Sequence, residues 1–244
     1  MAGHSKWANI KHRKAAVDAR RGKAFTKASK EIIVAARLGG GDPESNSRLR
    51  MAIQNARALS VPNDNIKRAI QRGTGEIEGV TYEEITYEGY GPGGVAVIVE
   101  CTTENRNRTV AELRATFSKC DGNLGESNSV AWNFTHKGEL RVETSQTEEA
   151  LFDIALEAGA DDVEMIDDGA LIHCSTDMLG ACNNALMSRN LTVAEARFTY
   201  EPNMTVEVTN PAIVKNLIKL LDMLEDNDDV QNVYNNADIP DHLL

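Results

Sequence analysis

Hydrophobic and polar positions follow a helical period at the start of the chain. Residues 23–38 place Phe25, Ala28, Ile32 and Ala36 at helical spacing, which predicts an amphipathic helix with a basic stripe on another side. The glycines at 39–41 would end it.

Two further helices are expected before residue 75. Asp42 would cap the second, with Pro43 in its first position, and its expected core face is Leu49, Ala52, Ile53, Ala56 and Leu59. A third helix follows Pro62 and ends at Gly73, with Ile66, Ala69 and Ile70 inside. The pattern therefore predicts a small three-helix bundle.

From residue 80 the pattern becomes that of strands. Residues 81–90 are aromatic and β-branched, and 91–94 (GPGG) predict a turn into a buried strand at 95–101. A helix capped by Asn105 would run to about residue 119, followed by a strand at 130–135.

A complete βαββαβ series, typical of a ferredoxin-like domain, follows Gly138. Its expected elements are strand 139–143, helix 147–158, strands 162–167 and 170–174, helix 177–189 and strand 193–200. The remaining strand 204–209, helix 211–225 and strand 229–235 would join the elements at 95–135 to give the same series a second time.

The sequence thus predicts an α+β fold, with an N-terminal three-helix bundle followed by two ferredoxin-like α/β sandwich domains, one inserted in the other. The expected domains are 1–79, the discontinuous 80–136 plus 202–244, and the inserted 137–201. One continuous α+β domain is the competing architecture, and it would need an unusually large sheet. A monomer is only slightly favoured, and the oligomeric state stays open.

Charge is divided along the chain. Residues 1–75 contain 16 Lys and Arg against 5 Asp and Glu, whereas residues 76–244 contain 10 against 32. The net charges are therefore +11 and −22, and they add to the formal charge of −11. Such asymmetry predicts a polyanionic partner for the first part and a body that repels the same partner.

The basic N-terminal region carries the strongest functional signal. Residues 1–21 offer few large apolar groups, so we expect a mobile arm that leads into the basic helix. A solvated helix face is the simpler interpretation, but it leaves the near absence of acids in this region unexplained. Lys and Arg neutralise phosphates, and Trp7 and His12 can stack on unpaired bases. The predicted nucleic-acid-binding residues are Lys6, Trp7, Lys11, His12, Arg13, Lys14, Arg20, Arg21, Lys23, Lys27, Lys30, Arg37, Lys67, Arg68, Arg72, Arg106 and Arg108.

Arg106 and Arg108 are a separate case, because they lie in the first turn of a predicted helix, where cations oppose the helix dipole. Pairing with a neighbouring carboxylate, such as Glu104 or Glu112, would remove the conflict. Contact with a phosphate backbone would remove it equally.

No constellation for catalysis, metal binding or cofactor binding is found. Residues 89–94 match G-x-G-x-x-G, but a strand follows them and Pro92 removes an amide donor, so a tight hairpin turn is expected there. The four cysteines are widely spaced and are expected to be small buried hydrophobes. There is no long apolar run and no secretory signal pattern, so a cytoplasmic, non-enzymatic protein is expected.

Four stretches together resemble the YebC family, also called the transcriptional regulatory protein family. They are MAGHSKWANIKHRKAAVDARRGKAFTKASKEI, VPNDNIKRAIQRGTG, YEGYGPGGVAVIVECTTENRNRT and GNLGES…SVAWNF. The resemblance covers nearly the whole chain. It implies three domains, a cytoplasmic location and a role in gene expression without known catalysis. The family's basic motif falls on Lys6, Trp7, Lys11, Arg13, Lys14, Arg20, Arg21, Lys23 and Lys27, and its Asn-Arg motif on Asn105, Arg106 and Arg108.

One stretch departs from the family pattern. The segment 120–129 has Asp121 and Asn128 where the family pattern leads us to expect glycines. Asn tolerates positive φ, so the turn is expected to survive.

Two functions remain open at this point. Bacterial members are described as DNA-binding transcriptional regulators, whereas mitochondrial relatives and some bacterial ones are described as ribosome-associated factors that assist translation through proline-rich stalls. The basic residues fit duplex DNA or ribosomal RNA, and the acidic body fits basic ribosomal proteins. An enzyme that uses an interdomain cleft is a third possibility that no motif supports.

Overall fold

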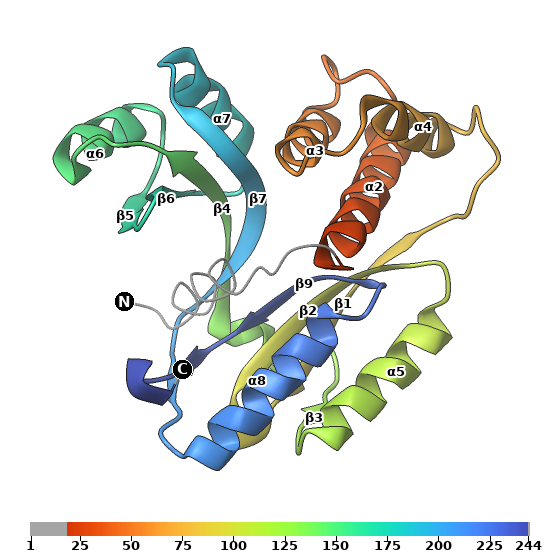
Figure 1. The fold of residues 1–244 in the computed structure, drawn as a ribbon, viewed down its shortest axis with the longest axis vertical. Coiled ribbons are helices and arrows are strands. Elements are labelled where there is room, and N and C mark those ends of the chain that lie inside the picture. The colour runs from red at the N-terminus through yellow and green to blue at the C-terminus, as the bar shows by residue number, and fades with distance from the viewer. Residues whose placement is uncertain (1–18, 244) are drawn as a thin grey trace. The chain divides into compact units, whose positions relative to one another are not determined.

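The computed structural model describes the backbone of residues 19–243 and the side chains of residues 22–243 (Figure 1). The chain forms two compact units. One contains Val80–Thr135 and Tyr200–Leu244, and the other comprises Ala24–Gly79 and His136–Thr199. No helix within the described residues is long and apolar enough to cross a membrane. The fold class is α+β, as predicted, with helices first and sheet-containing parts after them.

The N-terminal helices are α2 (Ala19–Gly39), α3 (Ser47–Ala58) and α4 (Asn63–Thr74). Helix α2 begins earlier than the predicted residue 23, because residues 19–21 (ARR) favour a helix and the single Gly22 does not interrupt it. The predicted core residues of α3 and α4 are buried except Leu59, which is 45% exposed beyond the end of α3, and Ile70, which is half-buried.

Two predicted helix ends are wrong. Asn46, not Asp42, caps α3: its Oδ1 accepts from Leu49 N at 3.0 Å, and its Nδ2 donates to Ala35 O and Gly40 O. Helix α4 continues past Gly73 to Thr74, and Gly75, whose φ is 82°, is its C-cap. A Cβ on Gly73 would lie 2.5 Å from Ile33 O, so this glycine permits close contact between α2 and α4.

The first unit is built on an antiparallel sheet of order β3-β1-β2-β9. Its strands are β1 (Glu83–Tyr90), β2 (Ala96–Thr103), β3 (Asn123–Leu124) and β9 (Val230–Asn235). Helices α5 (Arg106–Lys119) and α8 (Pro211–Glu225) pack side by side on one face (Figure 1). The core between the sheet and these two helices includes Val97, Val99, Leu113, Phe117 and Leu217.

Two predicted strands of this sheet differ from the structure. Residues 131–133 form a short 3-10 helix, and β4 (Phe134–Glu143) runs on into the other unit. Residues 206–207 form β8, which pairs in parallel with β10 (Ala237–Asp238). Strand β1 is central instead, because the tight turn at 91–94 folds it directly against β2. Gly91 N donates to Val95 O at 2.7 Å in this turn, which confirms the hairpin over a nucleotide-binding loop.

The inserted series has the predicted order of elements. It consists of β4, α6 (Glu148–Glu157), β5 (Asp162–Ile166), β6 (Gly169–Cys174), α7 (Leu179–Ser188) and β7 (Thr192–Pro202). The sheet order is β5-β6-β4-β7. Its core includes Leu140, Leu151, Ile172 and Leu186, and it contains the buried thiols of Cys174 and Cys182.

Helix α3 is joined to strand β7 within the second unit. Asn55 Nδ2 donates to Ala196 O at 2.8 Å, and Ala196 N donates back to Asn55 Oδ1 at 3.0 Å. Gln54 Nε2 donates to Val193 O at 3.1 Å. Because β7 is an edge strand, these carboxamides pair with backbone groups that the sheet leaves open. The predicted limits of the three domains stay predictions.

Candidate nucleic-acid interface

The predicted interface residues fall into three groups in the structure. Lys6, Trp7, Lys11, His12, Arg13 and Lys14 lie outside the described residues. Arg20 and Arg21 belong to α2, with side chains outside the described ones. The remaining positions can be placed.

Four cations of the helical bundle are exposed. Arg37 lies in the last turn of α2, and Lys67, Arg68 and Arg72 lie on α4, opposite its buried Ile66 and Ala69. None of the four forms an ion pair within residues 22–243. A Cβ on Gly73 would lie 3.3 Å from Arg37 N, so the C-terminal end of α4 lies against α2 at this point. Arg37 and Arg72 therefore lie near the same crossing point, and their position in last turns also suits the helix dipole.

Three lysines of α2 behave differently. Lys23 Nζ donates to Asp226 O at 2.7 Å and forms an ion pair with Asp226 Oδ1 at 3.1 Å. Lys27 is half-buried. Lys30 is only 6% exposed, so the prediction that it contacts a phosphate backbone is wrong for this conformation. Ile32–Ala36 are all buried, so little of the surface of α2 faces solvent in this stretch. The neighbouring Lys30 side chain is buried with them.

At the start of α5, the buried carboxylate of Asp229 accepts hydrogen bonds from three side chains. Its Oδ2 accepts from Thr103 Oγ1 at 3.0 Å, Thr109 Oγ1 at 2.9 Å and Arg108 Nη2 at 2.7 Å. Asn105 caps the helix by accepting from Arg108 N at 3.1 Å. The hydrogen bond and ion pair to Asp229 raise the pKa of the Arg108 guanidinium. This carboxylate is distant in sequence, and the pattern around residue 105 gave no signal for it.

The pairing hypothesis for the Asn-Arg motif is therefore confirmed for Arg108. Glu104 also contacts it, with 3.4 Å between Oε1 and Nη1, whereas Glu112 accepts from Asn227 instead. Arg106 stays exposed in the first turn. For Arg106, contact with a phosphate backbone stays a prediction.

The loop at 120–130 keeps its turns despite its departures from the family pattern. Asp121 and Asn128 have φ values of 59° and 66°, which confirms that these side chains tolerate the left-handed conformation. The buried Glu88 carboxylate accepts from the backbone N–H groups of Asn128, Val130 and Ala131 at 2.7–2.8 Å. Next to this loop the structure exposes Tyr90 and Trp132, which the sequence analysis did not single out.

Two family models match the chain. The N-terminal domain of the TACO1/YebC protein matches residues 5–76, and the second and third domain of TACO1/YebC match residues 82–237. A crystal structure of a conserved hypothetical protein from Aquifex aeolicus is similar, with a TM-score of 0.90 and 46% identity over 97% of this chain and 98% of that one.

Curated relatives match over the whole chain. A probable transcriptional regulatory protein of Dictyoglomus turgidum is 52% identical and covers 100% of this chain and 98% of its own length. Another, of Geobacter sulfurreducens, is 53% identical over 98% of this chain and 96% of its own length. With both family models matched in chain order and identity above half along the full length, the chain belongs to the TACO1/YebC family.

Proposed function

We propose that the protein is a cytoplasmic, non-enzymatic regulator of gene expression that binds duplex DNA through its basic N-terminal region. The observation that carries this proposal is the set of exposed bundle cations, Arg37, Lys67, Arg68 and Arg72, in a part of the chain with a net charge of +11. The names of the bacterial relatives, probable transcriptional regulatory proteins, support a regulatory role.

The expected mode of binding is contact with phosphates. Each neutralised phosphate of B-DNA releases counterions and adds about −0.9 to the slope of log K against log salt, so these four cations contribute roughly −3.6 together. The remainder of the chain, at −22, repels the same backbone. Opposed charges on one chain thus restrict which part of the protein approaches DNA.

A charge-neutralised variant tests the proposal. The test variant carries Arg37→Gln, Lys67→Gln, Arg68→Gln and Arg72→Gln. The matched control carries Arg114→Gln, Lys119→Gln, Lys215→Gln and Lys219→Gln, which removes the same charge from exposed positions on α5 and α8. We expect the test variant to bind a promoter duplex more weakly and with a flatter salt slope than the control.

Two outcomes would contradict this function. Equal weakening of both variants would mean that net charge, and not this surface, sets affinity. No binding of the wild-type protein to any duplex at low salt would exclude the DNA contact itself, whereas equal affinity for promoter and random duplexes would limit that contact to sequence-independent binding of phosphates.

A ribosome-associated translation factor is the second candidate. Trp7 and His12 within the basic region favour it, because aromatic rings stack on unpaired bases of irregular RNA better than in a duplex groove. Relief of stalls at proline-rich sequences is the activity that the family resemblance implies for this candidate. Crosslinking in cells, followed by sequencing of the attached nucleic acid, separates the two: ribosomal RNA or transfer RNA supports the second, and promoter DNA the first. Cosedimentation with ribosomes is best tested with the same four-residue variant, since charge reversal at Lys23 or Lys30 would disturb an ion pair or a buried side chain.

A further inference from the structure

Two aromatic side chains of the first unit share one hydrogen-bond acceptor. Tyr90 Oη donates to Ser129 O at 2.9 Å, and Trp132 Nε1 donates to the same oxygen at 3.0 Å. Tyr90 is 39% exposed and Trp132 is 63% exposed. Their polar atoms are thus satisfied internally, and what they offer a partner is the surface of their rings.

The support under these rings is rigid. Glu88 is 7% exposed, and its carboxylate holds the loop that carries Ser129 through the three backbone bonds described above. Asn133 continues the support by accepting from Met204 N at 3.0 Å and donating to Met204 O at 3.0 Å. Met204 is itself 57% exposed. We call Tyr90 and Trp132 the aromatic surface.

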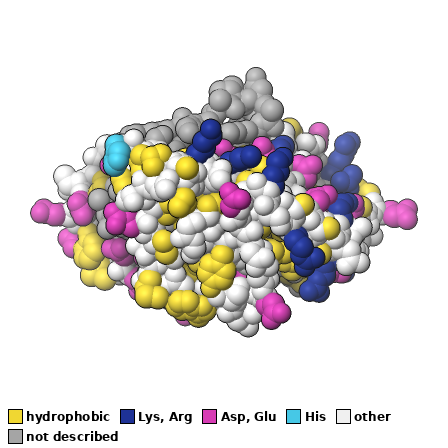
Figure 2. All heavy atoms as spheres, turned by 90° about the horizontal axis from the view of Figure 1, so that it is seen from below, with side chains coloured by type: hydrophobic (Ala, Val, Ile, Leu, Met, Phe, Trp, Pro, Cys, Tyr) yellow, Lys and Arg dark blue, Asp and Glu magenta, His cyan; other side chains and the backbone are white. Residues whose placement is uncertain are grey.

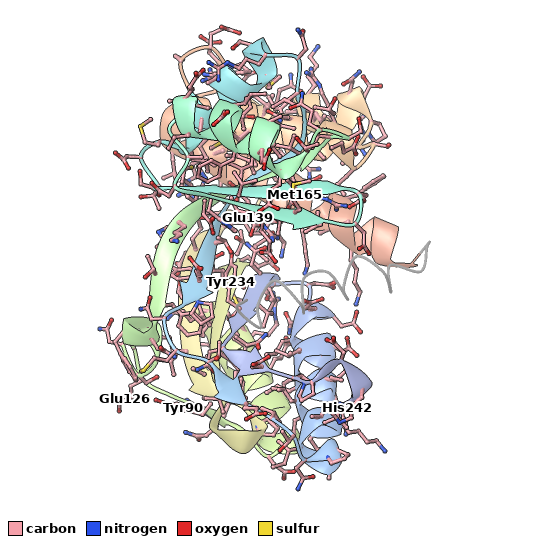
Figure 3. The ribbon with its side chains drawn as sticks, turned by 90° about the vertical axis from the view of Figure 1, so that its left-hand side faces the viewer. Tyr90, Glu126, Glu139, Met165, Tyr234 and His242 are labelled. Carbon is pink, nitrogen blue, oxygen red and sulfur yellow. The ribbon has the colours of Figure 1, made fainter. Side chains whose placement is uncertain are left out.

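The chain around the aromatic surface is acidic. The segments 80–105, 120–136 and 200–214 contain no Lys or Arg. The exposed acids of the loop that adjoins the rings are Asp121 and Glu126, and Glu88 lies buried beneath that loop. Glu83, Glu84 and Glu104 lie at the far end of the β1–β2 hairpin, and Lys119, Lys137 and Lys215 directly follow or precede the three segments. Figure 3 shows Glu126 at the same end of the unit as Tyr90. On the face drawn in Figure 2, hydrophobic side chains are exposed in several places, among them a group toward the lower edge.

The cations of the Asn-Arg motif lie far from these rings. Tyr90 pairs with Ala96 at one end of the β1–β2 hairpin, and Glu83 pairs with Thr103 at the other. Arg106 and Arg108 follow that other end, which is seven residues from Ala96 along β2, or roughly 23 Å. This is about three Debye lengths at physiological salt, so these arginines do not offset the negative potential at the aromatic surface.

We propose that the aromatic surface binds a Lys- and Arg-rich segment of a partner protein. Guanidinium and ammonium groups are attracted to the faces of Trp and Tyr rings, and the exposed carboxylates of Asp121 and Glu126 on the adjoining loop supply complementary charge. A nucleic-acid backbone would be repelled by the same carboxylates. The regulator would then carry a second contact, opposite in charge to the first and independent of it.

Trp132 provides a direct probe. The chain has two tryptophans, so Trp7→Phe leaves Trp132 as the only indole. The ligands are a labelled peptide rich in Arg and Gly, the same peptide with each Arg replaced by Gln, and a single-stranded oligo-uridine. We expect a saturable change in Trp132 emission with the Arg peptide alone. A saturable change with the oligonucleotide and none with the Arg peptide would overturn the proposal.

Variants locate the contact. Trp132→Ala and Tyr90→Ala should each weaken binding of the Arg peptide about fivefold, and Tyr90→Phe, which keeps the ring but loses the bond to Ser129 O, should bind nearly as the wild type does. Phe152→Ala is the control, because Phe152 is an aromatic residue of α6 with 44% exposure. Equal affinity of all four variants would refute the proposal. Duplex binding by the Tyr90 and Trp132 variants should be unchanged, so failure here is distinguishable from failure of the proposed DNA contact.

Discussion

Neutralising the buried Glu139 should lower the free energy of unfolding of the second unit. It lies on β4 with 8% of its side chain exposed and accepts from Arg197 Nε at 2.8 Å, with Arg197 Nη2 at 2.6 Å from the same oxygen. His173 Nε2 lies 3.3 Å from its other oxygen. Glu139→Gln keeps the shape but leaves the guanidinium, which is 23% exposed, without its main counter-charge.

The magnitude follows from this geometry. Removing one partner of a buried ion pair typically costs 3–5 kcal/mol, and we take about 2–3 kcal/mol because Arg197 is partly exposed. Glu195, 3.8 Å from Arg197 Nη1, also retains part of the attraction. Glu157→Gln is the matched control, since Glu157 pairs with Arg189 at the surface with 70% of its side chain exposed. Such a pair contributes about 0–1 kcal/mol.

The pH dependence gives the prediction a second test. Burial alone would raise the pKa of Glu139, but Arg197 and His173 outweigh it and hold that pKa well below its ordinary value of 4.5. A carboxylate with a lowered pKa in the folded state stabilises the protein fully above its ordinary pKa, and this contribution is lost as pH falls toward the folded-state value. The difference between wild type and Glu139→Gln should therefore be largest at neutral pH and shrink below about pH 4.5.

Urea unfolding followed by circular dichroism, at neutral and acid pH, measures both effects. The reasoning is refuted if Glu139→Gln unfolds at the same urea concentration as the Glu157→Gln control. It is equally refuted if the loss of stability is the same at pH 7 and pH 3, because a group that is not ionised in the folded state would give that result.

Two further substitutions test the packing of the helices and the network at α5. Gly73→Ala should destabilise the protein by about 1–3 kcal/mol, because its Cβ would lie 2.5 Å from Ile33 O, whereas Gly22→Ala meets nothing within 4 Å and should leave the melting temperature unchanged or higher. Asp229→Ala should cost about 2–4 kcal/mol in urea unfolding by leaving Thr103 and Thr109 with one acceptor fewer and Arg108 with only Glu104. An Asp229→Ala variant as stable as the wild type would contradict a structural role for this network.

The sequence determined the elements whose signals are local. Helical spacing around Ile32, Leu49 and Ile66 predicted the bundle, because an amphipathic helix records its buried face every three or four residues. The order of elements in the inserted series was predicted correctly, since its strands and helices alternate with clear turn residues between them. Asn128 and Asp121 kept their turns because tolerance of positive φ is a property of a single residue. Family membership also follows from local motifs that are read in chain order.

Only the tertiary structure decided which segments meet. The sequence did not show that β1 would take the central place in the first sheet, since strand pairing joins residues by contacts between backbones and not by the pattern within each strand. Nor did it show that Lys30 is buried, that Arg108 pairs with Asp229, or that Tyr90 and Trp132 share Ser129. The residue type alone sets a side chain's charge and shape. Its partner and its exposure depend on residues from distant positions, which come together only when the whole chain is folded.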